Sequence, residues 1–233
     1  MCGRGIIVPV NGPPTDSTRR SYDKIANAYT ARFGRELDDK PFDREFLDAV
    51  ADSVPRPGWC VDLGSGPSHI GAYLARWGLA ILNVDTSHEM LRHASVLVHG
   101  GVQVQADMRA LPFADRSIAG IIAFYSLIHI SRTELMTTLV ELGRVLAKDG
   151  VVAVAAHAAP PGNRTDQPMS ALHVEEMLSE PVDLDFHFYP AEVLGGALRS
   201  LDFNLVRATE RDPYDTQVEA QTRRAYVLAR KRP

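Results

Sequence analysis

The chain has 233 residues and a formal net charge of −4, from 25 basic and 29 acidic side chains. This length suits one α/β domain with a substantial core, because single domains typically run to about 250 residues. Charged residues of both signs are interspersed and form no basic block, so we do not expect a nucleic-acid partner. The two cysteines, Cys2 and Cys60, predict neither a disulfide framework nor a metal site.

The amino-terminal residues predict a cytoplasmic protein. The apolar run at residues 6–10 is too short for the core of a signal peptide. The longest apolar segment, residues 118–130, is shorter than the roughly 20 residues that a membrane-spanning helix needs. Residues 1–16 are rich in Gly and Pro and lack periodicity, so we predict a disordered tail there and one folded domain over residues 17–233.

Two helices are predicted before the sheet. Apolar residues repeat with helical spacing over residues 17–33, and again over residues 43–54, before Pro-Arg-Pro-Gly breaks the chain. The first helix presents Tyr22 and Tyr29 on one face. We expect this helix to form a lid whose order depends on a ligand.

Beyond this break, short apolar runs alternate with helical patterns, which is typical of consecutive βαβ units. Strands are predicted at WCVDLG, AILNVD, VQVQAD, GIIAFYSLI and VVAVAAH. Asp149-Gly150 predicts the turn before the last of these, and residues 158–168 and 173–189 are predicted to be irregular. A helix at residues 190–201 and the strands NLVRAT and RAYVLAR follow. The expected fold is a Rossmann-like doubly wound sheet, mostly parallel, with a C-terminal antiparallel strand pair and N-terminal lid helices.

The segment VDLGSGPSH, residues 61–69, runs from a strand through a glycine-rich turn into a helix. Ligands of doubly wound sheets bind beyond the carboxyl ends of the strands, where glycines let the backbone approach them closely. By itself, the pair Gly64 and Gly66 also fits an ordinary tight turn. However, Asp62, Asp85 and Asp107 fall at the ends of successive strands, where carboxylates can bind ribose hydroxyls and an adenine amino group. Together these residues predict a nucleotide-like cofactor.

Around these residues the chain resembles the class I S-adenosylmethionine-dependent methyltransferases, especially the small-molecule group that includes the ubiquinone and menaquinone methyltransferases. The matching segments are YDKIANAY, VDLGSGPS, NVDTSHEML, ADMRALPFADRSI and LGRVLAKDGVVAV, in the order of that family. The resemblance implies that S-adenosylmethionine is the cofactor. The cofactor-binding residues that it implies are Tyr22, Tyr29, Asp62, Gly64, Ser65, Gly66, Asp85, Thr86, Met90, Asp107, Met108 and Phe124.

By the same resemblance, individual residues take particular parts of the cofactor. Asp62 would hold the methionine amino group, and Asp85 the ribose hydroxyls. Met90 would line the adenine, whose edge Asp107 would contact. Phe124 would offer its backbone carbonyl to the amino group.

Methyl transfer is a displacement in which the protein mainly positions the acceptor, so a general base is optional. Histidine is the natural base near neutral pH, and His129, in the loop after the fourth strand, is the best placed candidate. Its alternative role is to hydrogen-bond the loop backbone. Further residues expected at the substrate are Tyr22, Tyr125, His157 and His187.

We expect the substrate to be a small, partly apolar molecule that is methylated on an O, N or C atom. It would lie between the lid helix, the loop that carries His129 and residues 158–189, although these apolar side chains could instead only cover the sheet edge. They are Met169, Leu172, Met177, Phe186, Phe188 and Tyr189. Two other functions stay open: a protein that binds S-adenosylmethionine but catalyses a non-methylating reaction, and an NAD-dependent oxidoreductase. A monomer and a homodimer are both consistent with the sequence.

Overall fold

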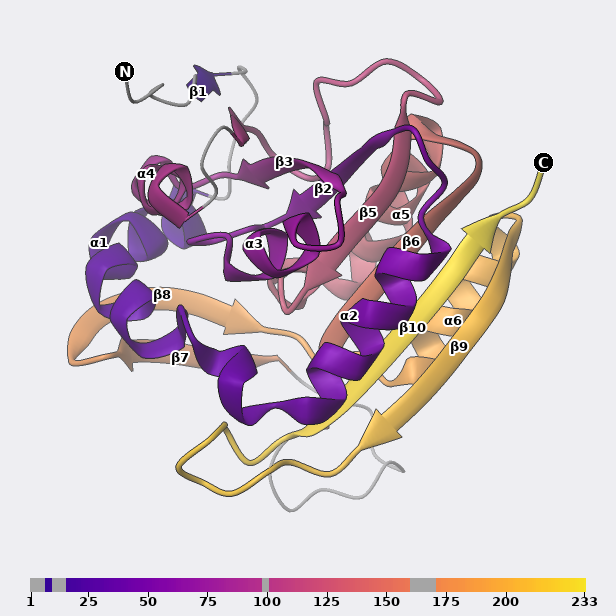
Figure 1. Ribbon diagram of the computed structural model, residues 1–233. Coiled ribbons are helices and arrows are strands. Elements are labelled where there is room, and N and C mark those ends of the chain that lie inside the picture. The colour runs from indigo at the N-terminus through magenta and orange to yellow at the C-terminus, as the bar shows by residue number, and fades with distance from the viewer. Residues whose placement is uncertain (1–6, 10–15, 98–100, 160–170) are drawn as a thin grey trace.

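The computed structural model describes residues 7–9, 16–97, 101–159 and 171–233. A central sheet runs through the molecule in the strand order β1-β4-β3-β2-β5-β6-β10-β9 (Figure 1). Its strands are β1 (Ile7–Pro9), β2 (Trp59–Leu63), β3 (Ala80–Asp85), β4 (Val102–Gln105), β5 (Ile118–Phe124), β6 (Leu146–Ala159), β9 (Phe203–Arg211) and β10 (Arg223–Lys231). The α-helices are α1 (Asp16–Phe33), α2 (Pro41–Ser53), α3 (His69–Ala75), α4 (His88–Leu97), α5 (Arg132–Val145) and α6 (Ala191–Ser200).

The pairing of the strands confirms the predicted fold class. Strands β1 to β6 pair in parallel, whereas β10 pairs antiparallel with both β6 and β9. The strand order reverses between β2 and β5, which lie side by side. In doubly wound sheets the ligand crevice opens at this point.

The sheet is covered on both faces because its strands are apolar on both sides. Along β6, the side chains of Val152 and Val154 belong to the core that includes α5 and α6, whereas Val151 and Ala153 belong to the core that includes α2 and α3. This alternation follows from the two-residue period of a strand. Each fully buried Val or Leu stabilises the fold by about 1.5–3 kcal/mol, so both cores hold the carboxyl ends of β2 to β5 in fixed positions.

A hairpin formed by β7 (Leu172–Met177) and β8 (Glu180–Phe186) packs against α1 (Figure 1). Ile25 of α1 is buried with Val182 and Leu184 of β8. The expectation that residues 173–189 are irregular is therefore wrong. The two-residue turn, Leu178 and Ser179, has positive φ at both positions without the Gly or Asn that usually marks such a turn. The sequence therefore lacks the usual hairpin signal.

Three further details differ from the expectation. Residues 7–9 of the predicted tail form β1, because the edge of β4 offers backbone groups for parallel pairing. The β6 strand spans both Asp149 and the predicted loop residues 158–159, and Asp149, not Gly150, has the positive φ of 59°. Asp tolerates this conformation better than most residues. Residues 1–6, 10–15 and 160–170, which include Cys2 and Met169, lie outside the described residues.

Candidate active site

Asp62 lies at the point where β2 passes through the glycine turn toward α3. Its carboxylate accepts a hydrogen bond from the Gly71 N–H, with an N–O distance of 2.9 Å. Burial raises the pKa of Asp62 to about 7. The glycine turn above it has positive φ at both Gly64 and Gly66, and a Cβ atom on Gly64 would lie only 2.3 Å from Ser126 Cβ. A positively charged ligand group in this turn would stabilise the Asp62 carboxylate.

Asp85, at the end of β3, faces the same turn. Its Oδ2 accepts a hydrogen bond from the Gly66 N–H and its Oδ1 one from the Ser87 N–H, both at 2.8 Å. Burial raises the pKa of Asp85 to about 6. The two backbone hydrogen bonds hold the carboxylate in one orientation, so β3 presents a rigid acceptor next to the glycine turn.

Asp107 follows β4 and is engaged by a neighbouring cation. Arg109 Nη2 donates to Asp107 Oδ2 at 2.6 Å, and Arg109 Nη1 pairs with Glu134 at 2.6 Å. The sequence predicts Asp107 as a direct acceptor for an adenine amino group, but it does not anticipate this ion pair. The pair restrains Asp107 and competes for its carboxylate oxygens.

These residues line one pocket at the carboxyl ends of β2 to β5, where the strand order reverses. The structure brings every residue of the expected cofactor set to this pocket: Tyr22, Tyr29, Asp62, Gly64, Ser65, Gly66, Asp85, Thr86, Met90, Asp107, Met108 and Phe124. These residues lie between positions 22 and 124 of the chain, and the parallel sheet together with α1 brings them to one pocket.

Helix α1 closes this pocket through Tyr22, which contacts His129. The Tyr22 hydroxyl and His129 Nε2 are 2.7 Å apart, and His129 Nδ1 lies 3.0 Å from the carbonyl oxygen of Asp185. A carbonyl only accepts, so Nδ1 carries the proton, and Nε2 accepts from Tyr22. Burial lowers the pKa of His129 to about 4, so the ring is neutral at physiological pH. The alternative role expected for His129 is a hydrogen bond to the backbone of its own loop. In the structure, the ring instead donates to the backbone of β8.

A second cavity of about 300 Å³ adjoins the first pocket. The two share Tyr22, Tyr29 and Tyr125 in their walls. Tyr125 follows β5 with a φ of 54°, a strained value for a bulky residue and of a kind that clusters at functional sites. The apolar wall of this cavity comes from α1 and the hairpin region and comprises Tyr22, Tyr29, Phe33, Leu172, Val174, Met177, Phe186 and Phe188.

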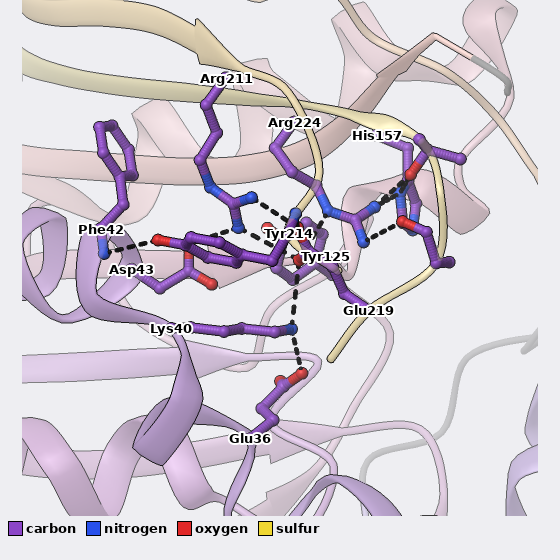
Figure 2. A network of polar contacts seen from close by, with 12 residues as sticks. Glu36, Lys40, Phe42, Asp43, Tyr125, His157, Arg211, Tyr214, Glu219 and Arg224 are labelled. Atoms are coloured by element: carbon purple, nitrogen blue, oxygen red, sulfur yellow. Dashed lines mark hydrogen bonds and ion pairs between the residues drawn. The ribbon is translucent and has the colours of Figure 1, made fainter. Parts of the chain in front are cut away.

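The opposite wall of the second cavity is a polar network (Figure 2). Glu219 accepts hydrogen bonds from Arg211 and Arg224, and Lys40 lies between Glu219 and Glu36. Burial opposes ionisation of Glu219, but hydrogen bonds from Arg211 and the charge of Arg224 outweigh it and lower its pKa to about 2. These residues were not predicted from the sequence, because they come from the segment that precedes α2 and from the C-terminal strand region, without a shared motif.

The predicted substrate residues separate into two groups. Tyr22, Tyr125 and His157 line the second cavity, and His129 lines the first pocket beside it. His187 lines neither of these cavities, and its ring lies 6.4 Å from that of Tyr189. Tyr189 is fully buried and donates to the carbonyl of Ile130, so it belongs to the core and not to a substrate wall.

Within the part of the chain that the structure describes, no helix is long and apolar enough to cross a membrane. The same residues contain no group of His, Cys, Asp or Glu side chains that could hold a metal ion. Cys60, in β2, is buried and has a free thiol, and burial raises the pKa of this thiol, so it is unreactive.

The sheet topology, the glycine turn and the acidic strand ends define a Rossmann-like protein with a nucleotide-type site. Residues 61–154 match the methyltransferase domain family. The chain is similar to the class I S-adenosylmethionine-dependent methyltransferases, and this similarity favours a methyltransferase over the alternative of an NAD-dependent oxidoreductase. The matches do not single out the ubiquinone and menaquinone enzymes.

Three relatives illustrate the similarity. YqeM of Bacillus subtilis (strain 168), named as a methyltransferase, is 22% identical over 242 residues, which cover 89% of this chain and 97% of YqeM. The structure of DhpI with S-adenosylhomocysteine has a TM-score of 0.70 at 18% identity and covers 94% of this chain and 97% of DhpI. The 1,6-didemethyltoxoflavin-N1-methyltransferase of Burkholderia thailandensis has a TM-score of 0.57 at 18% identity, covering 97% and 94% of the two chains. Its structure contains 1,6-didemethyltoxoflavin and S-adenosylhomocysteine.

Proposed function

We propose that the chain transfers a methyl group from S-adenosylmethionine in the first pocket to an O, N or C atom of a small, partly apolar molecule in the second cavity. The observation that carries this proposal is that both cavities share Tyr22, Tyr29 and Tyr125 in their walls. A small acceptor in the second cavity would therefore lie next to the first pocket. The bound 1,6-didemethyltoxoflavin of the Burkholderia enzyme supports an acceptor of this size.

The residues of the first pocket fit the cofactor. The Asp85 carboxylate, oriented by Gly66 and Ser87, would accept hydrogen bonds from the ribose hydroxyls. The buried Asp62 carboxylate would bind the amino group of the methionine part, whose positive charge would offset the cost of burial. Met90 would pack against the adenine, and Asp107, which also pairs with Arg109, would contact the adenine edge.

When bound, S-adenosylmethionine would supply a methyl group activated by its sulfonium; in-line displacement would form the bond to the acceptor and break the bond to sulfur, with S-adenosylhomocysteine as the leaving group. The chain contributes mainly by alignment, which is worth roughly 7–11 kcal/mol in well-oriented reactions. His129 takes up the acceptor's proton: the Tyr22 hydroxyl receives it and passes its own proton to His129 Nε2. With a pKa of about 4, His129 is a weak base, so we place its contribution at the lower end of the usual 10²–10⁴-fold range.

Calorimetric titration with S-adenosylmethionine, S-adenosylhomocysteine and NAD tests the first half of this proposal. We expect both adenosyl ligands to bind with micromolar dissociation constants and NAD not to bind. Transfer of a labelled methyl group to a small molecule, and to neither protein nor nucleic acid, tests the second half. Binding without transfer to any acceptor would favour a non-methylating reaction at the same site, and transfer only to a macromolecule would contradict the substrate assignment.

A further inference from the structure

His157, on β6, presents an imidazole ring with a fixed proton position to the second cavity. Its Nδ1 contacts the guanidinium of Arg224 (Figure 2). The same nitrogen lies 2.6 Å from the hydroxyl of Thr222. A guanidinium only donates hydrogen bonds, so Nδ1 is the unprotonated nitrogen. Burial and the charge of Arg224 lower the pKa of His157 well below its ordinary value, so the ring is neutral. The single ring proton therefore resides on Nε2.

The two histidines near the shared tyrosines thus differ in what they offer a ligand. His129 carries its proton on Nδ1 and presents a lone pair at Nε2, which Tyr22 occupies. His157 presents an N–H at Nε2, and this atom has no hydrogen-bond partner among the described residues. His157 is therefore a donor and not a base toward anything bound in the second cavity.

The charged side chains in the wall of this cavity balance one another. Lys40 Nζ lies 2.6 Å from Glu36 and 3.6 Å from Glu219, and Arg224 pairs with Glu219 at 3.2 Å. Both carboxyl groups have their pKa lowered to about 2, so the two anions match the two cations. The remaining guanidinium nitrogens of Arg224 donate to His157, Thr222 and the carbonyl of Ala220. A charged ligand would have to break one of these pairs.

Aromatic rings surround the His157 ring. The ring of Tyr125 lies 5.4 Å away, and those of Phe186 and Phe188 lie 6.4 and 6.3 Å away. Such surroundings favour a flat, ring-containing ligand, which would contact the faces and edges of these rings. An apolar ligand without an acceptor atom would leave the Nε2–H of His157 buried and unpaired, at a cost of about 1–3 kcal/mol.

We propose that the methyl acceptor is an uncharged, ring-containing molecule with a hydrogen-bond-accepting oxygen, such as a carbonyl, and that His157 Nε2–H donates to this oxygen. This inference rests on the proposed function, since it describes the occupant of the second cavity. His157 is then a specificity-determining residue that binds the acceptor through its N–H in the second cavity.

Matched bicyclic probes test this inference on the full chain saturated with S-adenosylhomocysteine. The probes are 1-tetralone, tetralin, and the anion 1,2,3,4-tetrahydro-1-naphthoate, with binding followed by ligand-observed NMR titration. We expect 1-tetralone to bind about tenfold more tightly than tetralin, because only the ketone pairs with the Nε2–H of His157. The anion should bind more weakly than the ketone. Tighter binding of the anion than of the ketone, or no binding of any probe, would overturn the inference.

Three variants connect the preference to one atom. His157→Phe keeps a ring but removes the donor, so 1-tetralone and tetralin should bind this variant with about equal affinity. His157→Gln restores an N–H donor and should recover part of the preference, whereas His187→Phe, outside both cavities, should leave it unchanged. A full preference in His157→Phe would contradict the inference. Calorimetric titration with S-adenosylhomocysteine checks that each variant is folded. If the native chain itself does not bind S-adenosylhomocysteine, the proposed function is contradicted, and not this inference alone.

Discussion

Asp85 offers the most direct residue-level test of the first pocket. Its two carboxylate oxygens are held by Gly66 and Ser87, and both would be lost in Asp85→Ala. We expect this variant to bind S-adenosylhomocysteine at least tenfold more weakly, which corresponds to about 1.4 kcal/mol, as measured by calorimetry. Asp52→Ala, an exposed position on α2, is the matched control and should bind like the native chain. Equal affinity of Asp85→Ala and the native chain would remove Asp85 from the site.

His129→Gln tests whether the imidazole acts as a base. Glutamine can still accept a hydrogen bond from Tyr22 but cannot take up a proton. We therefore expect kcat for a small-molecule acceptor to fall about tenfold to a hundredfold, while the affinity for S-adenosylmethionine changes less than about twofold.

The pH dependence distinguishes this base from a purely positional role. Because the pKa of His129 is lowered to about 4, the native ring is unprotonated above about pH 5 and loses base function as the pH falls through 4. The ratio of kcat between the native chain and His129→Gln should therefore be constant near neutral pH and should become smaller as the pH falls toward 4. His187→Gln serves as the control. Full activity of His129→Gln at neutral pH would show that no base is needed at this position.

At the level of elements, α1 lines both cavities and the β7–β8 hairpin lines the second one, and the two elements pack together as one cover. Ile25 packs against Leu184, and Ser21 exchanges hydrogen bonds with the backbone of Asp183. Lys24 adds a surface ion pair with Glu180. We expect S-adenosylhomocysteine to slow amide hydrogen exchange in α1 and in β8 together, because elements that share buried contacts open as a unit. Slower exchange in α1 alone would contradict a joint cover.

Leu184→Ala should separate the two parts of this cover. The substitution removes the buried contact with Ile25, so α1 amides should exchange faster, while those of the central strands stay unchanged. Val206→Ala, at a half-exposed position of β9, is the control. Unaltered exchange in α1 would show that the contact between Leu184 and Ile25 does not hold this helix in place.

Some of these elements could be predicted from the sequence, and others could not. The glycine turn and the ends of β2, β3 and β4 could be predicted, because their residues follow local spacing rules. The hairpin could not, since Leu178 and Ser179 adopt positive φ without the usual turn residues, and Val182 and Leu184 are buried only because α1 lies over them. The polar network in the wall of the second cavity could not be predicted either, because its side chains come from distant segments and meet only in the folded chain.

At the scale of the whole molecule, the polar network around Glu219 connects the N-terminal helices to the C-terminal strands. We call Glu219, Arg211, Arg224 and Lys40 the Glu219 cluster. Glu219 lies in the segment between β9 and β10, is completely buried and pairs with Arg211 and Arg224, and Lys40 approaches it from the residue before α2 (Figure 2). Arg211 also pairs with Asp43 of α2 at 3.2 Å. Removing the central anion would leave the buried Arg224 without its carboxylate partner and would take one of two carboxylate partners from Arg211 and from Lys40. Breaking a buried ion pair in this way typically costs about 3–5 kcal/mol.

We therefore expect Glu219→Gln to lower the free energy of unfolding by about 3–5 kcal/mol at pH 7, as measured by urea denaturation. The folded-state pKa of Glu219 is lowered to about 2 from an ordinary 4.5, so its contribution is complete above about pH 4.5 and is lost as the pH falls toward 2. The difference in the free energy of unfolding between the native chain and Glu219→Gln should become smaller over that same pH interval. Glu176→Gln, at an exposed position of β7, should match the native chain at every pH. A Glu219→Gln variant as stable as the native chain at pH 7 would show that the cluster's cations are already satisfied without this anion, and that α2 and the C-terminal strands are joined by apolar packing alone.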